Sequence, residues 1–200
     1  MEKFASLLSV DAYNYKKTIE DLEEKRFDGL HFDILDGHFV KNFGFNLYII
    51  NSLRKITKLK FNIHLQIENP EIYINEFIKA GADILTIHPQ TCNNLERELR
   101  FIKSQGAQSS IAVDPEVKIK NIEKYLPLVD NVVILTVYPG FGEQKFIEKS
   151  LQKIKELKNI ILENKFPISI SIDGSVNSEN AEILKRYGAD ILIYGSSLFN

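Results

Sequence analysis

Residues 168–174 read ISISIDG, a strict alternation of isoleucine with serine that ends in an aspartate and a glycine. Successive side chains of a β-strand point to opposite faces, so the three isoleucines are predicted to face helices while Ser169, Ser171 and Asp173 face inward. Short β-branched runs of this kind recur along the chain, with amphipathic stretches between them. This pattern is typical of βα units with a parallel sheet, and therefore of the α/β class.

The spacing of these runs predicts the fold. Strands are predicted at residues 4–9, 30–33, 61–65, 84–88, 110–113, 132–137, 168–172 and 191–194. Helices are predicted between them, including residues 15–26, 70–80, 95–105, 147–164 and 178–187. Ser178 is expected to cap the last of these helices.

Eight parallel strands with intervening helices fit either a closed barrel or an open doubly wound sheet. Polar residues recur at the carboxyl ends of many strands rather than at one crossover point, which favours the closed (β/α)8 TIM barrel. Residues 195–200 are too few for a closing helix. We therefore expect a single TIM-barrel domain over residues 1–200, with eight strands and seven helices, that lacks its last helix.

The composition excludes several classes of partner. The 25 Lys and Arg residues against 27 Asp and Glu residues give a net charge of −2, and the charges are scattered, so nothing indicates a nucleic-acid partner. No run approaches the roughly 20 apolar residues of a membrane helix, so the chain is predicted to be cytoplasmic with no membrane partner. The single cysteine, Cys92, excludes an intramolecular disulfide and a cysteine-built metal site. Apolar helix surface left uncovered at the barrel's end would favour a homo-oligomer.

A cluster of histidines and aspartates is predicted at the carboxyl ends of the strands. His31 and Asp33 lie two residues apart in LHFDILDG (30–37), so both face inward, and His64 and Asp173 end other strands. A lone strand-end His or Asp more often caps a helix or a loop, but four at one rim predict a site for one divalent ion, Zn²⁺, Fe²⁺, Mn²⁺ or Co²⁺. Asp36 is expected to be structural. His88 is expected to pack behind the site.

Glycine-rich segments follow the last three predicted strands: VYPGFGEQKF (137–146), IDGSVN (172–177) and YGSSLF (194–199). One such segment is usually only a turn. Three in succession, where TIM barrels commonly bind phosphate, predict that backbone N–H groups hold a phosphorylated small molecule.

Several longer blocks resemble the ribulose-phosphate 3-epimerase family over almost the whole chain. They are SLLSVD (6–11), HFDILDGHFV (31–40), HLQIENP (64–70), GADILTIHP (81–89), LTVYPGFGEQKFI (135–147), SIDGSVN (171–177) and YGSSLF. The resemblance implies an isomerase of carbohydrate metabolism, in the pentose phosphate pathway, that inverts C3 of D-ribulose 5-phosphate to give D-xylulose 5-phosphate. It acts through a metal-stabilised enediolate.

The same resemblance implies the roles of individual residues. His31, Asp33, His64 and Asp173 would be the metal ligands, and Asp33 with Asp173 the catalytic acid and base. A sugar phosphate would be bound by Ser6, His64, Gly140, Phe141, Gly142, Glu143, Gly174, Ser175, Gly195 and Ser196. Inversion beside a ketone needs proton removal from one face and return to the other, which two carboxylates supply.

The chain departs from the family's pattern at several positions. Leu35, Gln66 and Leu135 stand where the family typically has methionine, and Glu143 and Ser175 replace glycines. The DGS-x-N form and the HPQT segment are more similar to the D-allulose 6-phosphate 3-epimerase branch, so a six-carbon substrate stays an alternative. A decarboxylase is disfavoured because the Asp-x-Lys-x-x-Asp pattern lacks its lysine here. A homologue that binds a sugar phosphate without turnover is the remaining alternative.

Overall fold

The computed structural model describes residues 1–199 as a closed barrel of eight parallel strands in sequence order, β1 to β8, with β8 pairing back onto β1. The strands are β1 (Glu2–Ser6), β2 (Gly29–Leu35), β3 (Lys60–Gln66), β4 (Ile84–Ile87), β5 (Gln108–Val113), β6 (Asn131–Leu135), β7 (Ser169–Val176) and β8 (Ile191–Tyr194). The predicted TIM barrel is confirmed.

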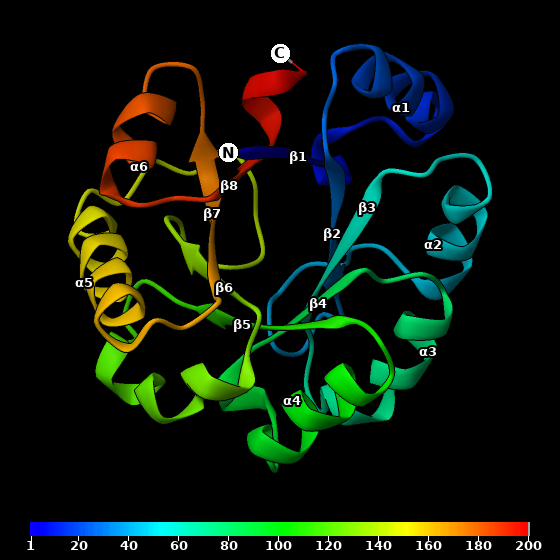
Figure 1. The fold of residues 1–200 in the computed structure, drawn as a ribbon. Coiled ribbons are helices and arrows are strands. Elements are labelled where there is room, and N and C mark those ends of the chain that lie inside the picture. Colours follow the sequence, from blue (N-terminus) through cyan, green and yellow to red (C-terminus); the bar gives the residue numbers. More distant parts are fainter. Residues whose placement is uncertain (200) are drawn as a thin grey trace.

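Helices form a ring outside the strands (Figure 1). They are α1 (Tyr15–Glu24), α2 (Leu47–Arg54), α3 (Ile74–Lys79), α4 (Leu95–Ser104), α5 (Ser150–Asn164) and α6 (Ala181–Tyr187). The main apolar core lies between this ring and the barrel, and it contains Ile168, Ile170 and Ile172 as the alternation of residues 168–174 predicts. No described helix is both long and apolar enough to cross a membrane.

Several predicted boundaries are wrong, and side chains explain some of them. The first strand ends at Ser6 rather than at residue 9, because the Ser6 hydroxyl accepts the Leu8 N–H and starts the 3-10 turn η1 (Leu7–Ser9). Residues 70–80 form the short turn η3 (Pro70–Ile72) and then α3, not one helix. Ser178 does not cap α6. Instead the Asn177 side chain accepts the N–H groups of Glu179 and Asn180.

The expectation of seven helices is also wrong for the described residues. The connection from β5 to β6 holds only the 3-10 turns η5 (Ile119–Asn121) and η6 (Glu123–Leu128). Pro127 lies inside η6, where its missing N–H prevents a regular α-helix. After β8 the described residues form the turn η7 (Ser196–Leu198), so the closing helix is absent from that part of the chain.

Four aspartates at the amino-terminal mouth of the barrel repeat one contact. Each precedes an even-numbered strand, and its carboxylate accepts a backbone N–H of the strand before it. The pairs are Asp28 with Lys3, Asp83 with Phe61, Asp130 with Ser109 and Asp190 with Ile170. In each pair the aspartate N–H is donated back to the carbonyl of the same partner. These reciprocal bonds fix the register of each odd strand against the start of the next.

Candidate metal centre and phosphate pocket

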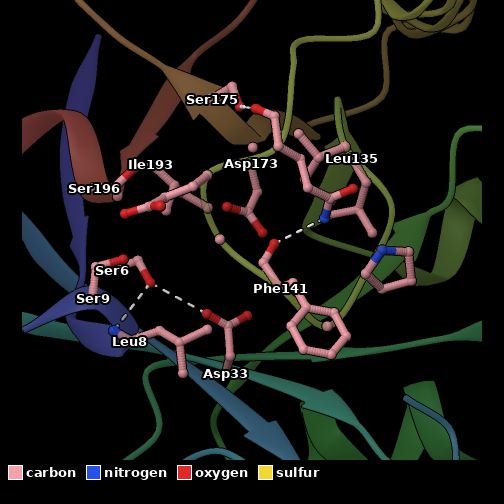
Figure 2. A pocket seen from close by; sticks show the side chains of 18 of the residues that line it. Ser6, Leu8, Ser9, Asp33, Leu135, Phe141, Asp173, Ser175, Ile193 and Ser196 are labelled. Atoms are coloured by element: carbon pink, nitrogen blue, oxygen red, sulfur yellow. Dashed lines mark hydrogen bonds between the residues drawn. The ribbon is translucent and has the colours of Figure 1, made fainter. Parts of the chain in front are cut away.

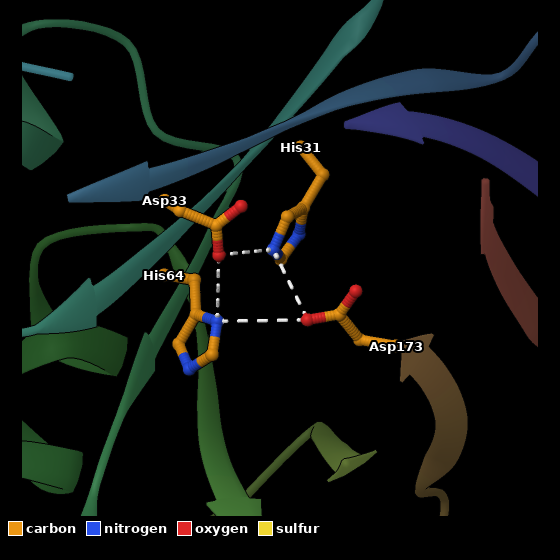
Figure 3. Close-up of side chains that lie close together, drawn as sticks. All are labelled: His31, Asp33, His64 and Asp173. Atoms are coloured by element: carbon orange, nitrogen blue, oxygen red, sulfur yellow. Dashed lines mark hydrogen bonds and ion pairs between the residues drawn. The ribbon is translucent and has the colours of Figure 1, made fainter. Parts of the chain in front are cut away.

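Four side chains from three strands converge inside the carboxyl-terminal mouth of the barrel (Figure 3). His31 and Asp33 lie on the same face of β2, and Asp33 is in register with His64 of β3. Asp173 reaches the group from β7. His31 and His64 are fully buried, and Asp33 is 6% exposed.

The four donor atoms form a ring in which each carboxylate oxygen faces both imidazoles. Asp33 Oδ1 lies 3.3 Å from His31 Nε2 and 3.3 Å from His64 Nδ1. Asp173 Oδ2 lies 3.7 Å from His31 Nε2 and 3.9 Å from His64 Nδ1. A tetrahedral ion with ligands at ~2.0–2.1 Å spaces those ligands by ~3.4 Å, close to the spacing found here. Two nitrogen and two oxygen donors, all within 4.8 Å of one another, therefore fit a borderline divalent cation.

The two carboxyl groups of the ring differ in acidity. Burial alone would raise the pKa of Asp33, but the charge and hydrogen bond of His31, with those of His64, hold it below its usual range. Burial raises the pKa of Asp173 to about 6, and the negative charge of Asp33 adds to this effect. Two neighbouring carboxyl groups with opposite pKa shifts are typical of acid and base pairs.

The histidines of the ring are perturbed in opposite directions as well. Burial would lower the pKa of His31, but Asp33 and Asp173 outweigh it and the pKa rises. Burial lowers the pKa of His64 to about 4. The hydrogen bond to Asp33 opposes this effect, and the neighbouring imidazoles of His88 and His31 add to it. The His64 ring is therefore neutral at neutral pH, the form that can ligate a metal.

A pocket opens above the ring and encloses about 660 Å³ of space, part of it open to solvent. Figure 2 shows Asp33 and Asp173 facing into it, with Ser6 beside Asp33. The Ser6 hydroxyl donates to Asp33 Oδ2 at 3.2 Å. All predicted substrate-binding residues line this pocket except His64, whose Nδ1 faces the ring beneath it. No lysine or arginine of the described residues lines it.

Backbone in the left-handed region shapes the glycine-rich wall of the pocket. Gly174 has φ of +112°, and a Cβ there would lie 2.6 Å from a methyl of Val137. The position therefore needs glycine for both conformation and space. Glu143 and Ser175 also have positive φ, at 58° and 51°. The Ser175 hydroxyl donates to the Gln144 carbonyl, which ties the loop after β6 to the end of β7.

Comparison with known proteins agrees with this geometry. The model of the ribulose-phosphate 3-epimerase family matches residues 4–199. The chain belongs to this family. The Bacillus subtilis ribulose-phosphate 3-epimerase is 40% identical over 195 residues, which cover 97% of this chain and 90% of the relative. The Methanocaldococcus jannaschii enzyme of the same name is 37% identical, with 98% and 82% covered.

The similarity to ribulose-phosphate 3-epimerases includes a plant enzyme, and a protein outside the family shares the fold alone. The chloroplast enzyme of Arabidopsis thaliana is 36% identical, over 97% of this chain and 70% of its own. A tryptophan synthase α-subunit from Pyrococcus furiosus aligns with a TM-score of 0.74 at 11% identity, covering 99% of this chain and 87% of that one. The named members are epimerases, so the expected enzyme class, isomerase, is the class of the family.

The two supporting residues singled out in this epimerase-family sequence lie outside the ring. Asp36 accepts the N–H groups of His38, Phe39 and Glu68, which order the loop after β2. Burial opposes ionisation of Asp36, yet these donors lower its pKa. His88 contacts the outer nitrogen of His64, as expected for a residue behind the site.

Two further residues near the ring were not assigned contacts from the sequence. Gln66 donates from Nε2 to Asp33 Oδ1 at 2.6 Å, and Asp114 lies 3.0 Å from His88 through its Oδ1. The signal for Gln66 was its inward register, two residues after His64. Asp114 directly follows β5, so its position at a strand end was visible in the sequence. Nothing in the sequence pairs it with His88.

Proposed function

We propose that this chain is a metal-dependent ketose-phosphate 3-epimerase that interconverts D-ribulose 5-phosphate and D-xylulose 5-phosphate. The observation that carries the proposal is the placement of two carboxylates, from β2 and β7, at opposite corners of one histidine-bridged ring, under a pocket walled by the glycine-rich segments. Family membership supports the reaction class, and the His and Asp donor set supports a divalent ion.

The residues of the ring would have two roles, holding the ion and transferring protons. His31, Asp33, His64 and Asp173 would hold the ion, which when bound supplies Lewis acidity at the substrate's carbonyl and hydroxyl oxygens. One of Asp33 and Asp173 removes the C3 proton while the other returns a proton to the opposite face, and their roles exchange with direction. Ser6 holds Asp33 in place through its 3.2 Å hydrogen bond.

The phosphate would rest on backbone N–H groups of the three glycine-rich segments: Gly140 to Glu143, Gly174 with Ser175, and Gly195 with Ser196. Among the described residues no lysine or arginine lines the pocket, which supports this, because an anion would then be held by N–H dipoles and hydroxyl groups. Glu143 is exposed, so its carboxylate can remain in solvent, away from the bound dianion. The phosphate is remote from C3, so its binding energy can position the substrate.

The test is deuterium incorporation at C3 in D₂O, measured by NMR, with ribulose 5-phosphate and D-allulose 6-phosphate in separate reactions. Exchange with the pentose phosphate supports the proposal, whereas exchange with the hexose phosphate alone assigns the substrate to the other branch. Absence of exchange after Zn²⁺, Fe²⁺, Mn²⁺ and Co²⁺ have each been supplied would leave a binding protein. An Asp173→Asn protein should lose exchange, and parent-like exchange would remove Asp173 from the mechanism.

The cytoplasmic location, the single domain over residues 1–200 and the homo-oligomer stay predictions. Their checks are independent of the catalytic one. Light scattering of the purified protein gives the oligomeric state directly.

A further inference from the structure

His64 is bonded on both sides of its ring. Its Nδ1 faces the carboxylates of Asp33 and Asp173, and its Nε2 lies 2.9 Å from Nε2 of His88. Both rings are fully buried. Their planes are 13° from parallel and their centroids are 5.0 Å apart, so the short contact joins ring edges. This geometry suits an N–H···N hydrogen bond.

A carboxylate lies on the far side of His88. Asp114 Oδ1 is 3.0 Å from His88 Nδ1, and the other Asp114 oxygen accepts a 2.6 Å hydrogen bond from Gln90 Nε2. The amide nitrogen of Gln90 is thereby committed to Asp114, although it also lies 3.4 Å from His88 Nδ1. The rings of Phe39 and His88 pack with centroids 4.7 Å apart. A continuous row therefore runs from Asp114 through His88 and His64 to the four-donor ring.

The contacts constrain where the hydrogens lie. Only one hydrogen fits between the two Nε2 atoms, because two would clash and none would leave two facing lone pairs. The Asp114 carboxylate can only accept, and its Oδ1 lies 3.0 Å from His88 Nδ1 in a close contact that is not aligned as a hydrogen bond, so a hydrogen on Nδ1 is favoured by charge. A neutral His88 then has an accepting Nε2, so the shared hydrogen belongs to His64 Nε2. His64 Nδ1 lies 3.3 Å from the Gln66 amide nitrogen but also faces the carboxylates of Asp33 and Asp173, which would accept a hydrogen from it in the absence of a cation. The assignment with an unprotonated Nδ1 therefore applies to the protein with the cation bound.

We propose that His88 and Asp114 are positioning residues that fix His64 in the tautomer with Nε2–H, so that Nδ1 is left as a donor for the cation. The proposal rests on the metal-binding site of the proposed function. Outer partners of this kind orient a ligating imidazole and increase its basicity, and their loss typically lowers metal affinity by 10–100-fold. The two histidines of the ring then differ in their outer partners: His64 Nε2 bonds His88, whereas His31 Nδ1 is buried with no partner among residues 1–199.

The first test compares cation affinity in three variants by competition with a chromophoric chelator, using Co²⁺ and Zn²⁺ without substrate. His88→Leu removes the acceptor for His64 and should weaken binding by about 10–100-fold. His88→Gln keeps an acceptor toward His64 and a donor toward Asp114, so it should recover most of that loss. Thr86→Val is the matched control, because Thr86 is a buried inward residue of β4 that bonds Asn62 instead of His64. It should bind the cation as the parent does.

The second test needs no variant. Two-bond ¹H–¹⁵N spectra of the Zn²⁺-loaded protein, labelled at histidine, report which ring nitrogen carries the hydrogen. The expected result is His64 protonated at Nε2 and His88 at Nδ1. Protonation of His64 at Nδ1, or a His88→Leu protein that binds Co²⁺ as tightly as the parent, would overturn the proposal. Neither readout involves a ketose phosphate, so failure of the epimerase assay and failure of this assignment are separate results.

Discussion

Gln66 is the residue at which this chain's site differs most from the pattern it resembles. Its side chain is buried at the base of the pocket, and Nε2 donates to Asp33 Oδ1 at 2.6 Å while lying 3.3 Å from His64 Nδ1. Turning the amide round would place its carbonyl against the carboxylate, so this orientation is the favoured one. Oε1 has no partner within the described part of the chain. The amide thus donates to Asp33 Oδ1 and lies close to His64 Nδ1, and both of these atoms would ligate the cation.

Gln66→Glu should make the stability of the fold depend on the cation. The substitution keeps the shape but replaces a donor facing Asp33 with a third negative charge, so the chelator-treated protein should lose about 1–3 kcal/mol of unfolding free energy. A divalent cation should restore much of this loss, because it neutralises the added repulsion. Urea unfolding with EDTA and with Mn²⁺ measures both effects.

The control for this change is Gln66→Met, which also loses the donor but adds no charge and removes the orphaned carbonyl. It should be more stable than Gln66→Glu in EDTA and should gain less from Mn²⁺. Equal stability of the two variants in EDTA would show that the added carboxylate does not repel Asp33.

At the scale of elements, the alternation of side chains predicts which strand residues face inward. His31, Asp33 and Asp173 could be brought together from sequence because each occupies an inward position of a strand with period-two alternation, with both aspartates near the carboxyl end. Strand and helix ends were less predictable, since side chains there compete for the same N–H groups. Ser6 ends β1 early, and the Asn177 side chain, rather than Ser178, accepts the N–H groups of the turn before α6. The bonds among His64, His88 and Asp114 join three different strands or their ends, and no single strand's pattern encodes them.

The sequence contains a repeated aspartate that marks the start of every even-numbered strand, and the strand predictions did not draw on it. Asp28, Asp83, Asp130 and Asp190 each stand directly before an even-numbered strand, at positions where the sequence alone suggests only a turn residue. Three of them also meet a cation, with Asp190 lying 3.1 Å from Lys158 Nζ. Their shared role, bonding the backbone of the preceding odd-numbered strand, depends on how the strands are paired in the folded barrel.

Asp190→Ala should therefore destabilise the barrel without disturbing the pocket. The change leaves the Ile170 N–H without its 3.0 Å acceptor between β7 and β8, at a cost of about 1–3 kcal/mol. Lys158→Met removes only the partly exposed ion pair and should cost less, at most about 1 kcal/mol. Urea unfolding compares the two, and a Lys158 variant as unstable as the Asp190 variant would contradict the backbone role. Cation affinity should be unchanged in both.

For the whole molecule, the two mouths of the barrel use their acids differently. At the amino-terminal mouth the aspartates are bonded to strand backbone, and they set register. At the carboxyl-terminal mouth Asp33 and Asp173 both face the same two histidines, and both line the pocket. Residues that stabilise the fold and residues that would perform the reaction are therefore at opposite ends of the same strands. A net charge of −2 is compatible with an anionic substrate, because the proposed phosphate site would rely on backbone N–H groups and no lysine or arginine among residues 1–199 lines the pocket.

A cation bound in the ring would connect β7 with β2 and β3, and β7 is a neighbour of neither strand in the closed sheet. Cation binding should therefore be coupled to unfolding of the entire barrel. An ion that binds only the folded state at 100 times its Kd adds about 2.7 kcal/mol to the unfolding free energy. The unfolding midpoint should thus rise with the logarithm of Mn²⁺ or Zn²⁺ concentration and fall to a constant value in EDTA. Asp173→Asn replaces an anionic ligand with a weaker, neutral amide oxygen and should lose most of this increment. Asp190→Ala, at the other mouth, should unfold at a lower temperature but keep the full increment. Calorimetry across a cation titration measures all three proteins, and an increment of equal size in the Asp173 variant would place the cation outside the ring.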